Sequence, residues 1–184
     1  MTFSNPHIRG LRFSGSDIHG RYQWEKSATS WKEISNFSGP LASNKPKLYV
    51  FSDGTWPYYV GMTRQSLSAR LRLGFRAMAK KHSSGYAGYA FKEEGRERAS
   101  VLHVWIEEDP APDPEKPGAY CPKNVETIEA ELVYLIRNAG DWPKYQTEIH
   151  FSRASDHQLQ LAQQILDHFP ADGSCAIPLL PEPN

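Results

Sequence analysis

The sequence has little cysteine, no long apolar run and no excess of either charge, and each absence excludes a class of protein. Cys121 and Cys175 are isolated in a chain of 184 residues, so we expect free thiols in a reducing compartment, without a disulfide framework or a zinc site. No apolar run approaches the ~20 residues of a membrane span. Residues 1–10 lack the apolar core of a signal peptide. We therefore expect a cytoplasmic protein without a membrane partner.

The net charge is zero, with 21 basic and 21 acidic residues, which argues against a non-specific nucleic-acid coat. The charges are unevenly spread, however. Basic residues gather between Arg64 and Arg98, whereas acidic residues gather between Glu107 and Glu115. This pattern fits either a solvated helix face or a basic face for a phosphate backbone. There is also no internal repeat, Gly-rich phosphate loop or paired Cys/His motif.

The readable part of the chain begins with a predicted β-hairpin that leads into a helix. Residues 48–51 and 58–60 are short runs of β-forming residues, separated by the turn cluster Asp53-Gly54-Thr55. Ser66 is a plausible N-cap for a helix over residues 67–81. The apolar stripe of that helix, at helical spacing, consists of Leu67, Leu71, Phe75 and Met78.

The rest of the sequence predicts an α+β protein with a small three-stranded sheet and flanking helices. A nearly continuous apolar run predicts a third strand at 101–106, and a Pro-rich loop follows at 109–124. We expect helices at 125–139 and 155–169, the second with a capping box from Ser155 to Gln158. The remaining expectations are a short helix at 30–34, a loop at 82–99 and an edge strand at 148–151. The expected organisation is an N-terminal extension (1–46), a catalytic domain (47–151) and a C-terminal helix and tail (152–184).

The residue identities around the hairpin carry more information than its shape. Tyr49 and Tyr59 fall on neighbouring predicted strands, Gly61 follows Tyr59 by two residues, and Arg70 lies one turn into the helix. A tyrosine pair alone would be a stabilising cross-strand contact. Taken together, the stretches Lys47-Leu48-Tyr49, Tyr59-Val60-Gly61 and Ser68-Ala69-Arg70-Leu71 resemble the GIY-YIG endonuclease family. The first stretch departs from the family pattern, which has Gly where this chain has Lys47.

Glu129 extends the resemblance to the helix at 125–139. At 100° per residue, Glu129 falls between Ile136 and Val133, inside the apolar arc of that helix, where a carboxylate is costly unless it is paired or binds a metal. The family's metal-binding Glu lies on such a helix and is followed by two aliphatic residues, here Leu132 and Val133. Glu131 at the margin of the arc matches this pattern less well but stays open as the ligand. A salt bridge from Glu129 to Arg70, or a partly exposed position at the edge of the apolar arc, is the structural alternative.

The resemblance implies a DNA endonuclease that depends on Mg²⁺, or on another divalent cation such as Mn²⁺. Glu129 would hold the metal ion, and Arg70 would stabilise charge on the phosphate. Tyr49 would be the general base for the attacking water, and Tyr59 would orient that water. Many relatives have a His one turn after the Arg, but this chain has Gly74 there, and the nearest substitutes are Lys81 and His82. Gln146 stands where the family often has an Asn.

Two further hypotheses stay open. One is a catalytically inactive nucleic-acid-binding module on the same scaffold, and the other is a protein-interaction domain that keeps only the scaffold.

Overall fold

The computed structural model describes residues 1–13, 21–26, 31–33, 36–79, 99–139, 146 and 151–169. It is an α+β fold, as predicted, built on one antiparallel sheet with the strand order β3-β2-β1-β6-β4-β5. The strands are β1 (His7–Phe13), β2 (Arg21–Lys26), β3 (Trp31–Glu33), β4 (Lys47–Ser52), β5 (Pro57–Thr63) and β6 (Ala99–Ile106). The helices of the described residues are η1 (Gly39–Ala42), α1 (Leu67–Ala79), α3 (Lys123–Asn138) and α4 (Asp156–Leu166).

The prediction of three strands was wrong, because three further strands in the N-terminal part of the chain belong to the sheet. β1 pairs with β6, and β2 and β3 continue the sheet beyond β1. The short helix expected at 30–34 is also wrong where the structure describes it, since residues 31–33 pair with β2. The described core side chains of the sheet come from four strands: β1, β4, β5 and β6.

The three strands expected from the sequence are confirmed. Every residue of β4 is buried, because this strand has neighbours on both sides and helices on both faces. β5 lies at the edge of the sheet. Residues 109–122 contain five prolines and form a connection with a single isolated bridge, Pro112 to Tyr120, in line with the missing backbone donors of proline.

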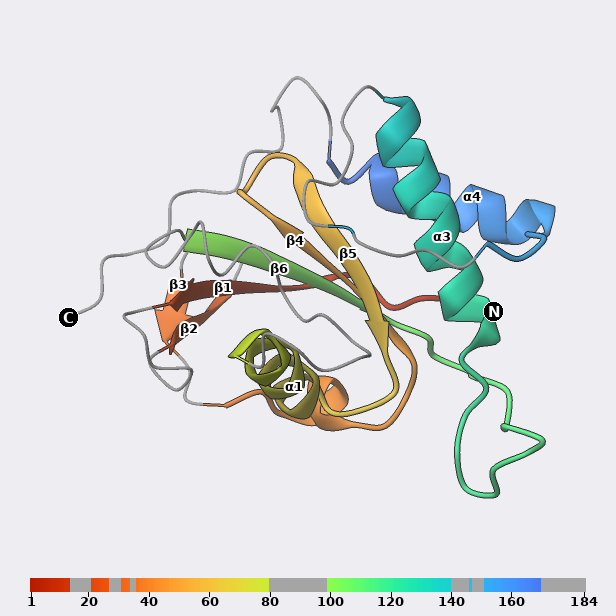
Figure 1. Ribbon diagram of the computed structural model, residues 1–184, viewed down its shortest axis with the longest axis horizontal. Helices are drawn as coiled ribbons and strands as arrows, with labels where there is room; N and C mark the ends of the chain where they lie inside the picture. Colours follow the sequence, from red (N-terminus) through yellow and green to blue (C-terminus); the bar gives the residue numbers. More distant parts are fainter. Residues whose placement is uncertain are drawn as a thin grey trace.

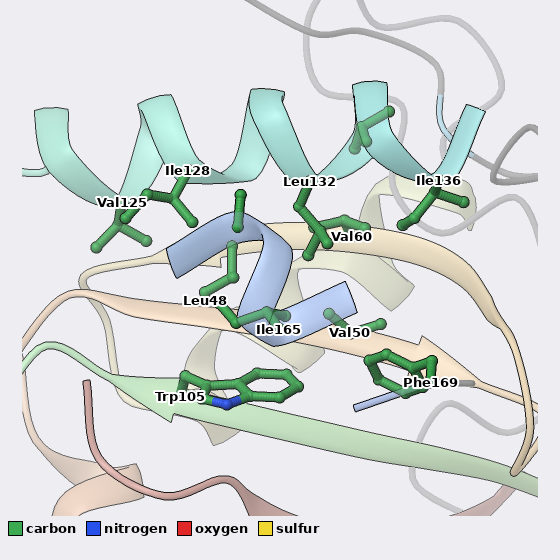
Figure 2. Packing of buried hydrophobic residues seen from close by; sticks show 12 residues of the cluster. Leu48, Val50, Val60, Trp105, Val125, Ile128, Leu132, Ile136, Ile165 and Phe169 are labelled. Atoms are coloured by element: carbon green, nitrogen blue, oxygen red, sulfur yellow. The ribbon is translucent and has the colours of Figure 1, made fainter. Parts of the chain in front are cut away.

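The helices cover opposite faces of the sheet, with α1 on one side and α3 and α4 on the other (Figure 1). We call the first the α1 face; its buried cluster includes Leu41 of η1 and Leu67 and Leu71 of α1. The second is the α3–α4 face, where side chains of α3 point onto Leu48, Val50 and Val60 (Figure 2). Phe75 and Met78 of the predicted stripe lie outside the described side chains.

Sequence signals for the helix ends are confirmed in two places. Ser66 accepts a hydrogen bond from the backbone N–H of Ala69 through its side chain (3.4 Å), as an N-cap does. Ser155 and Gln158 form the expected reciprocal capping box. The loop at 82–98 and the edge strand at 148–150 fall outside the described residues.

Candidate functional site

The turn between β4 and β5 is built by one aspartate and one glycine. Asp53 Oδ1 accepts hydrogen bonds from Thr55 N (3.0 Å), Thr55 Oγ1 (2.7 Å) and Trp56 N (3.0 Å). Gly54 adopts a φ of 103°, which favours glycine. This turn sets the register in which Tyr49 lies opposite Gly61 and Phe51 opposite Tyr59.

Tyr49, Tyr59 and Gly61 form one close-packed unit on the α1 face. The two tyrosine rings are stacked, with centroids 6.2 Å apart and an interplanar angle of 27°. A Cβ atom at Gly61 would lie 2.6 Å from both Cζ and the hydroxyl oxygen of Tyr49, and 2.9 Å from Cε1 of Tyr59. Glycine is therefore required at this position, because only its bare backbone admits the Tyr49 ring.

Arg70 reaches this tyrosine unit from α1. Its backbone N–H donates to Ser66 O (3.0 Å) in the first helical turn. Its Nε donates to the Tyr49 hydroxyl oxygen at 3.0 Å. Tyr49 has no solvent exposure, whereas Arg70 is partly exposed. The contact thus joins a buried phenol to a cation at the protein surface.

Glu129 lies on α3 and is partly buried. Burial raises the pKa of Glu129 to about 8, while the Arg70 guanidinium acts in the opposite direction and Glu126, one turn earlier, adds to the rise. The opposing effect of Arg70 means that this cation lies within electrostatic range of the Glu129 carboxylate. α1 and α3 cover opposite faces, and β5 is the outermost strand.

Glu129 fits a divalent cation held through one carboxylate. A buried carboxylate with a raised pKa lacks sufficient positive charge around it, and Arg70 compensates for this only in part. Mg²⁺ is commonly held by one or two carboxylates, with water and phosphate oxygens completing its shell. Among the residues that the structure describes, no three His, Cys, Asp or Glu side chains form a metal-binding group. A site of several carboxylates is thus not found in that part of the chain.

The remaining sequence expectations near the site have mixed outcomes. Gly74 is buried in α1 and supplies no base, and Lys81 and His82 lie outside the described residues. Gln146 accepts a hydrogen bond from Val60 N (3.2 Å), so its amide lies against β5 between Tyr59 and Gly61. Glu131 is partly exposed on α3.

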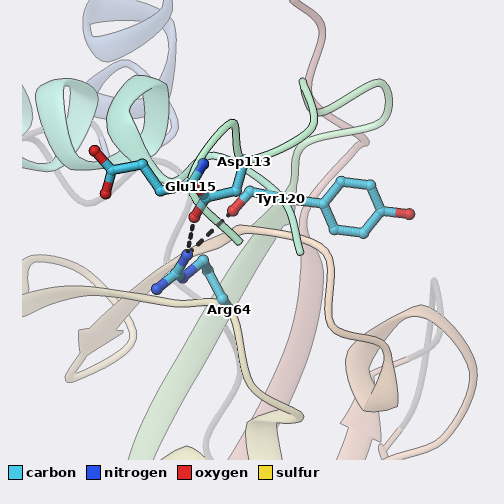
Figure 3. A network of polar contacts seen from close by, with 4 residues as sticks. All are labelled: Arg64, Asp113, Glu115 and Tyr120. Carbon is cyan, nitrogen blue, oxygen red and sulfur yellow. Dashed lines mark hydrogen bonds and ion pairs between the residues drawn. The ribbon is translucent and has the colours of Figure 1, made fainter. Parts of the chain in front are cut away.

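Arg64 is engaged in a polar network. One terminal nitrogen of its guanidinium donates to Asp113 Oδ2 (3.0 Å) and to Tyr120 O (3.2 Å), as Figure 3 shows. Asp113 in turn accepts from Glu115 N (3.0 Å) through its other oxygen. Arg64, at the start of the basic segment, therefore pairs with Asp113 of the acidic segment. This contact anchors the Pro-rich connection beside the start of α1.

Sequence reasoning missed two buried polar groups. The first is Lys47 at the start of β4, which is fully buried. The second is a chain of hydrogen bonds on the α3–α4 face, from Ser52 Oγ to His103 Nε2 (3.1 Å) and from His103 Nδ1 to His168 Nε2 (3.2 Å). Alternation along β4 and β6 could have placed Ser52 and His103 on one face, but no spacing signal connects them to His168.

Comparison with protein-family models, curated proteins and solved structures found no match. Within the described residues, no helix is both long and apolar enough to cross a membrane. The function is therefore argued from the geometry of the site.

Proposed function

We propose that this chain is a metal-dependent DNA endonuclease of the GIY-YIG type. The observation that supports this proposal best is the position of Arg70. Its Nε donates to the Tyr49 hydroxyl at 3.0 Å, and its charge acts on the Glu129 carboxylate. From these two contacts we infer that a phenol from β4, a guanidinium from α1 and a carboxylate from α3 share one region at the edge of the sheet formed by β5.

Arg70 would bind the phosphate. A guanidinium is charged at every relevant pH, and its planar fork matches two phosphate oxygens. The hydrogen bond from Nε to Tyr49 fixes the plane of that fork. A cation held in a fixed orientation stabilises the extra negative charge of the transition state without reorganising during the reaction.

Tyr49 has a clear orienting role in this arrangement, since its hydroxyl accepts from Arg70 and the residue has no solvent exposure. Its role as general base stays a prediction, which requires substrate binding to bring a water molecule to the hydroxyl. Tyr59 is 7% exposed and stacks beside Tyr49, which suits the predicted role of orienting the attacking water.

Glu129 would hold Mg²⁺ or Mn²⁺ at the same edge. When bound, the ion would polarise the scissile phosphate and stabilise the departing oxygen. The carboxylate must be deprotonated to bind a cation, and its pKa of about 8 means that proton and metal compete at neutral pH. Arg70 and Glu129 would then contact the same phosphate group, one directly and the other through the ion.

The test is nicking of supercoiled plasmid DNA in Mg²⁺ and in Mn²⁺, with EDTA as the metal-free condition. We expect cleavage with metal and none with EDTA. Arg70→Ala and Glu129→Ala should fold normally and lose cleavage by at least about a hundredfold, as expected for removing one partner of the transition-state charge.

Matched controls come from the same two helices. Arg72→Ala removes an exposed charge from α1, and Glu131→Ala removes the alternative carboxylate from α3; both should cleave within about threefold of the wild type. Wild-type turnover in Arg70→Ala or Glu129→Ala would remove that residue from the site. DNA binding by the wild type without cleavage in either metal would favour the inactive binding module instead.

A further inference from the structure

Lys47 is a buried cation that the proposed chemistry does not use. Lysine is rarely fully buried unless it is paired, yet Lys47 has no solvent exposure. Its ammonium donates to three backbone carbonyls: Ser43 O (2.6 Å), Lys45 O (2.8 Å) and Gln65 O (3.3 Å). An ammonium has three donors, so each has an acceptor. Burial lowers the pKa of Lys47 to about 8, which leaves the group mostly charged at neutral pH.

The three carbonyls belong to two segments: the one that follows η1 and the turn that leads into α1. Ser43 is the C-cap of η1, which packs beneath α1 through Leu41. Gln65 lies in the turn between β5 and α1, directly before the N-cap Ser66. Because Ser66 O accepts from the backbone N–H of Arg70, the carbonyl that Lys47 holds directly precedes the carbonyl that accepts the first hydrogen bond of the helix.

Lys47 and Tyr49 are two residues apart on β4, so their side chains lie on the same face of the sheet. One holds the turn before α1 through Gln65 O, and the other contacts Arg70 through its hydroxyl. β4 is therefore connected to α1 by two polar contacts, one at the start of the helix and one at the first turn. A helix fixed at both points has little freedom to slide along the strand.

The turn before α1 also has links that do not involve Lys47. Arg64 is held by Asp113 at 3.0 Å, and Gln65 N donates to Thr63 Oγ1 at 3.0 Å. Loss of the Lys47 ammonium should therefore leave the helix formed and packed through Leu67 and Leu71. What it removes is the contact that sets the position of the helix relative to β4.

We propose that Lys47 is a positioning residue that sets the start of α1 and so aligns Arg70 with Tyr49. The proposal rests on the proposed nuclease function of the same site. A displacement of about 1 Å in a catalytic group can lower a rate roughly a hundredfold. Lys47 would therefore act on the turnover rate through Arg70, without contact with the substrate.

The test compares Lys47→Met, which has a similar length and no donor, with Lys47→Gln, which keeps two of the three donors. Lys45→Met is the matched control, because Lys45 donates to Glu108 O at the exposed surface. We expect Lys47→Met to lower kcat by about tenfold to a hundredfold with KM within about twofold. Lys47→Gln should fall between Lys47→Met and the wild type, and Lys45→Met should match the wild type.

A second measurement does not depend on cleavage. The Nε–H of Arg70, followed by its ¹⁵N resonance, should exchange with water at least about tenfold faster in Lys47→Met, because its hydrogen bond to Tyr49 is loosened. If the wild type cleaves no DNA, the nuclease proposal fails, but this exchange rate still decides the role of Lys47. A Lys47→Met variant that melts earlier yet keeps the wild-type kcat and exchange rate would overturn the positioning role. If Lys47→Met does not fold, Lys47→Gln decides by the same two readouts.

Discussion

The two faces of the sheet use polar side chains in different ways. On the α1 face, two cations contact neighbouring elements: Lys47 holds the turn before α1, and Arg70 contacts Tyr49. On the α3–α4 face, the buried chain through His103 consists of neutral groups, and it lies against Trp105 and Phe169. On the α1 face, cations with fixed partners set the position of a helix. The α3–α4 face is held together mainly by contact between apolar side chains.

The largest expected effect is a loss of stability, which should be similar for the two faces, whereas the loss of activity should differ between them. Leu71 and Ile165 are both buried, one on each face. Leu71→Ala and Ile165→Ala should each lower the free energy of unfolding by about 2–5 kcal/mol in urea titrations, through lost burial and a residual cavity. Only Leu71→Ala should also lower the kcat of the folded protein, because Leu71 lies next to Arg70 in α1, whereas α4 carries none of the proposed site residues. An equal loss of kcat in both variants would contradict the distinction between the faces.

The next largest effect is a loss of stability at acid pH that arises on the α3–α4 face. Burial and, to a smaller extent, the neighbouring His168 together lower the pKa of His103 to about 3. Between pH 6.5 and about 3, the unfolded chain binds a proton at this position and the folded chain does not. The stability that His103 contributes is therefore complete above pH 6.5 and is lost as the pH falls, by about 2–3 kcal/mol at pH 4.

His103→Gln should flatten this dependence, since a glutamine does not titrate. The matched control is His157→Gln at an exposed position of α4, which should leave the pH dependence of unfolding as in the wild type. An unchanged acid transition in His103→Gln would show that other groups control it.

Gly61→Ala should break the tyrosine unit of the α1 face. The added Cβ would lie 2.6 Å from the Tyr49 ring, opposite a strand that is buried on both faces, which is an overpacking of about 1–3 kcal/mol. In a Tyr49→Leu background the same substitution should cost less, because the two nearest atoms that the Cβ meets, both of Tyr49, are gone. Additive costs in the double variant, measured by urea unfolding, would disprove the steric explanation.

The smallest expected effect concerns Glu129, whose contribution to stability falls as the pH rises, opposite to that of His103. Its pKa is raised from 4.5 to about 8, so the folded state favours the protonated form. The stability from this group is complete below pH 4.5 and is lost as the pH rises through 8. Glu129→Gln avoids that loss and should be more stable than the wild type by about 1–2 kcal/mol at pH 8, with little difference at pH 4.5.

The measurement is urea unfolding in EDTA at both pH values, with Glu131→Gln as the control that should show no such gain. A Glu129→Gln variant that is less stable than the wild type at pH 8 would show that the carboxylate is well compensated in the folded protein.

The local pattern of the sequence was sufficient for the hairpin, for α1 and for the capping box of α4. These features depend on residues that are close in the chain, such as Asp53 with Gly54 and Ser155 with Gln158. The six-stranded sheet was not predictable in this way, because β1 pairs with β6 across about 90 residues of chain, as the partners Arg9 and Leu102 show. Trp31 to Glu33 follow the same rule, since pairing with β2 outweighed their helical preference.

The residues of the candidate site also differ in whether local sequence patterns could predict them. Residue types and spacing indicated Tyr49, Tyr59, Arg70 and Glu129, and the roles of these residues stay predictions. Lys47 was treated as a departure from a glycine pattern. Its partners are backbone carbonyls, and a carbonyl leaves no trace in residue identity. His168 was missed for a related reason, since its contact with His103 spans 65 residues.

The amide of Gln146 on Val60 has a consequence for association between molecules. An outermost strand offers unpaired N–H groups that another strand can join, and proteins block such positions to avoid aggregation. Gln146 Oε1 occupies the N–H of Val60 in the middle of β5, so an incoming strand would first have to displace it. One side chain thereby hinders the pairing of a β-strand from another molecule at the middle of β5.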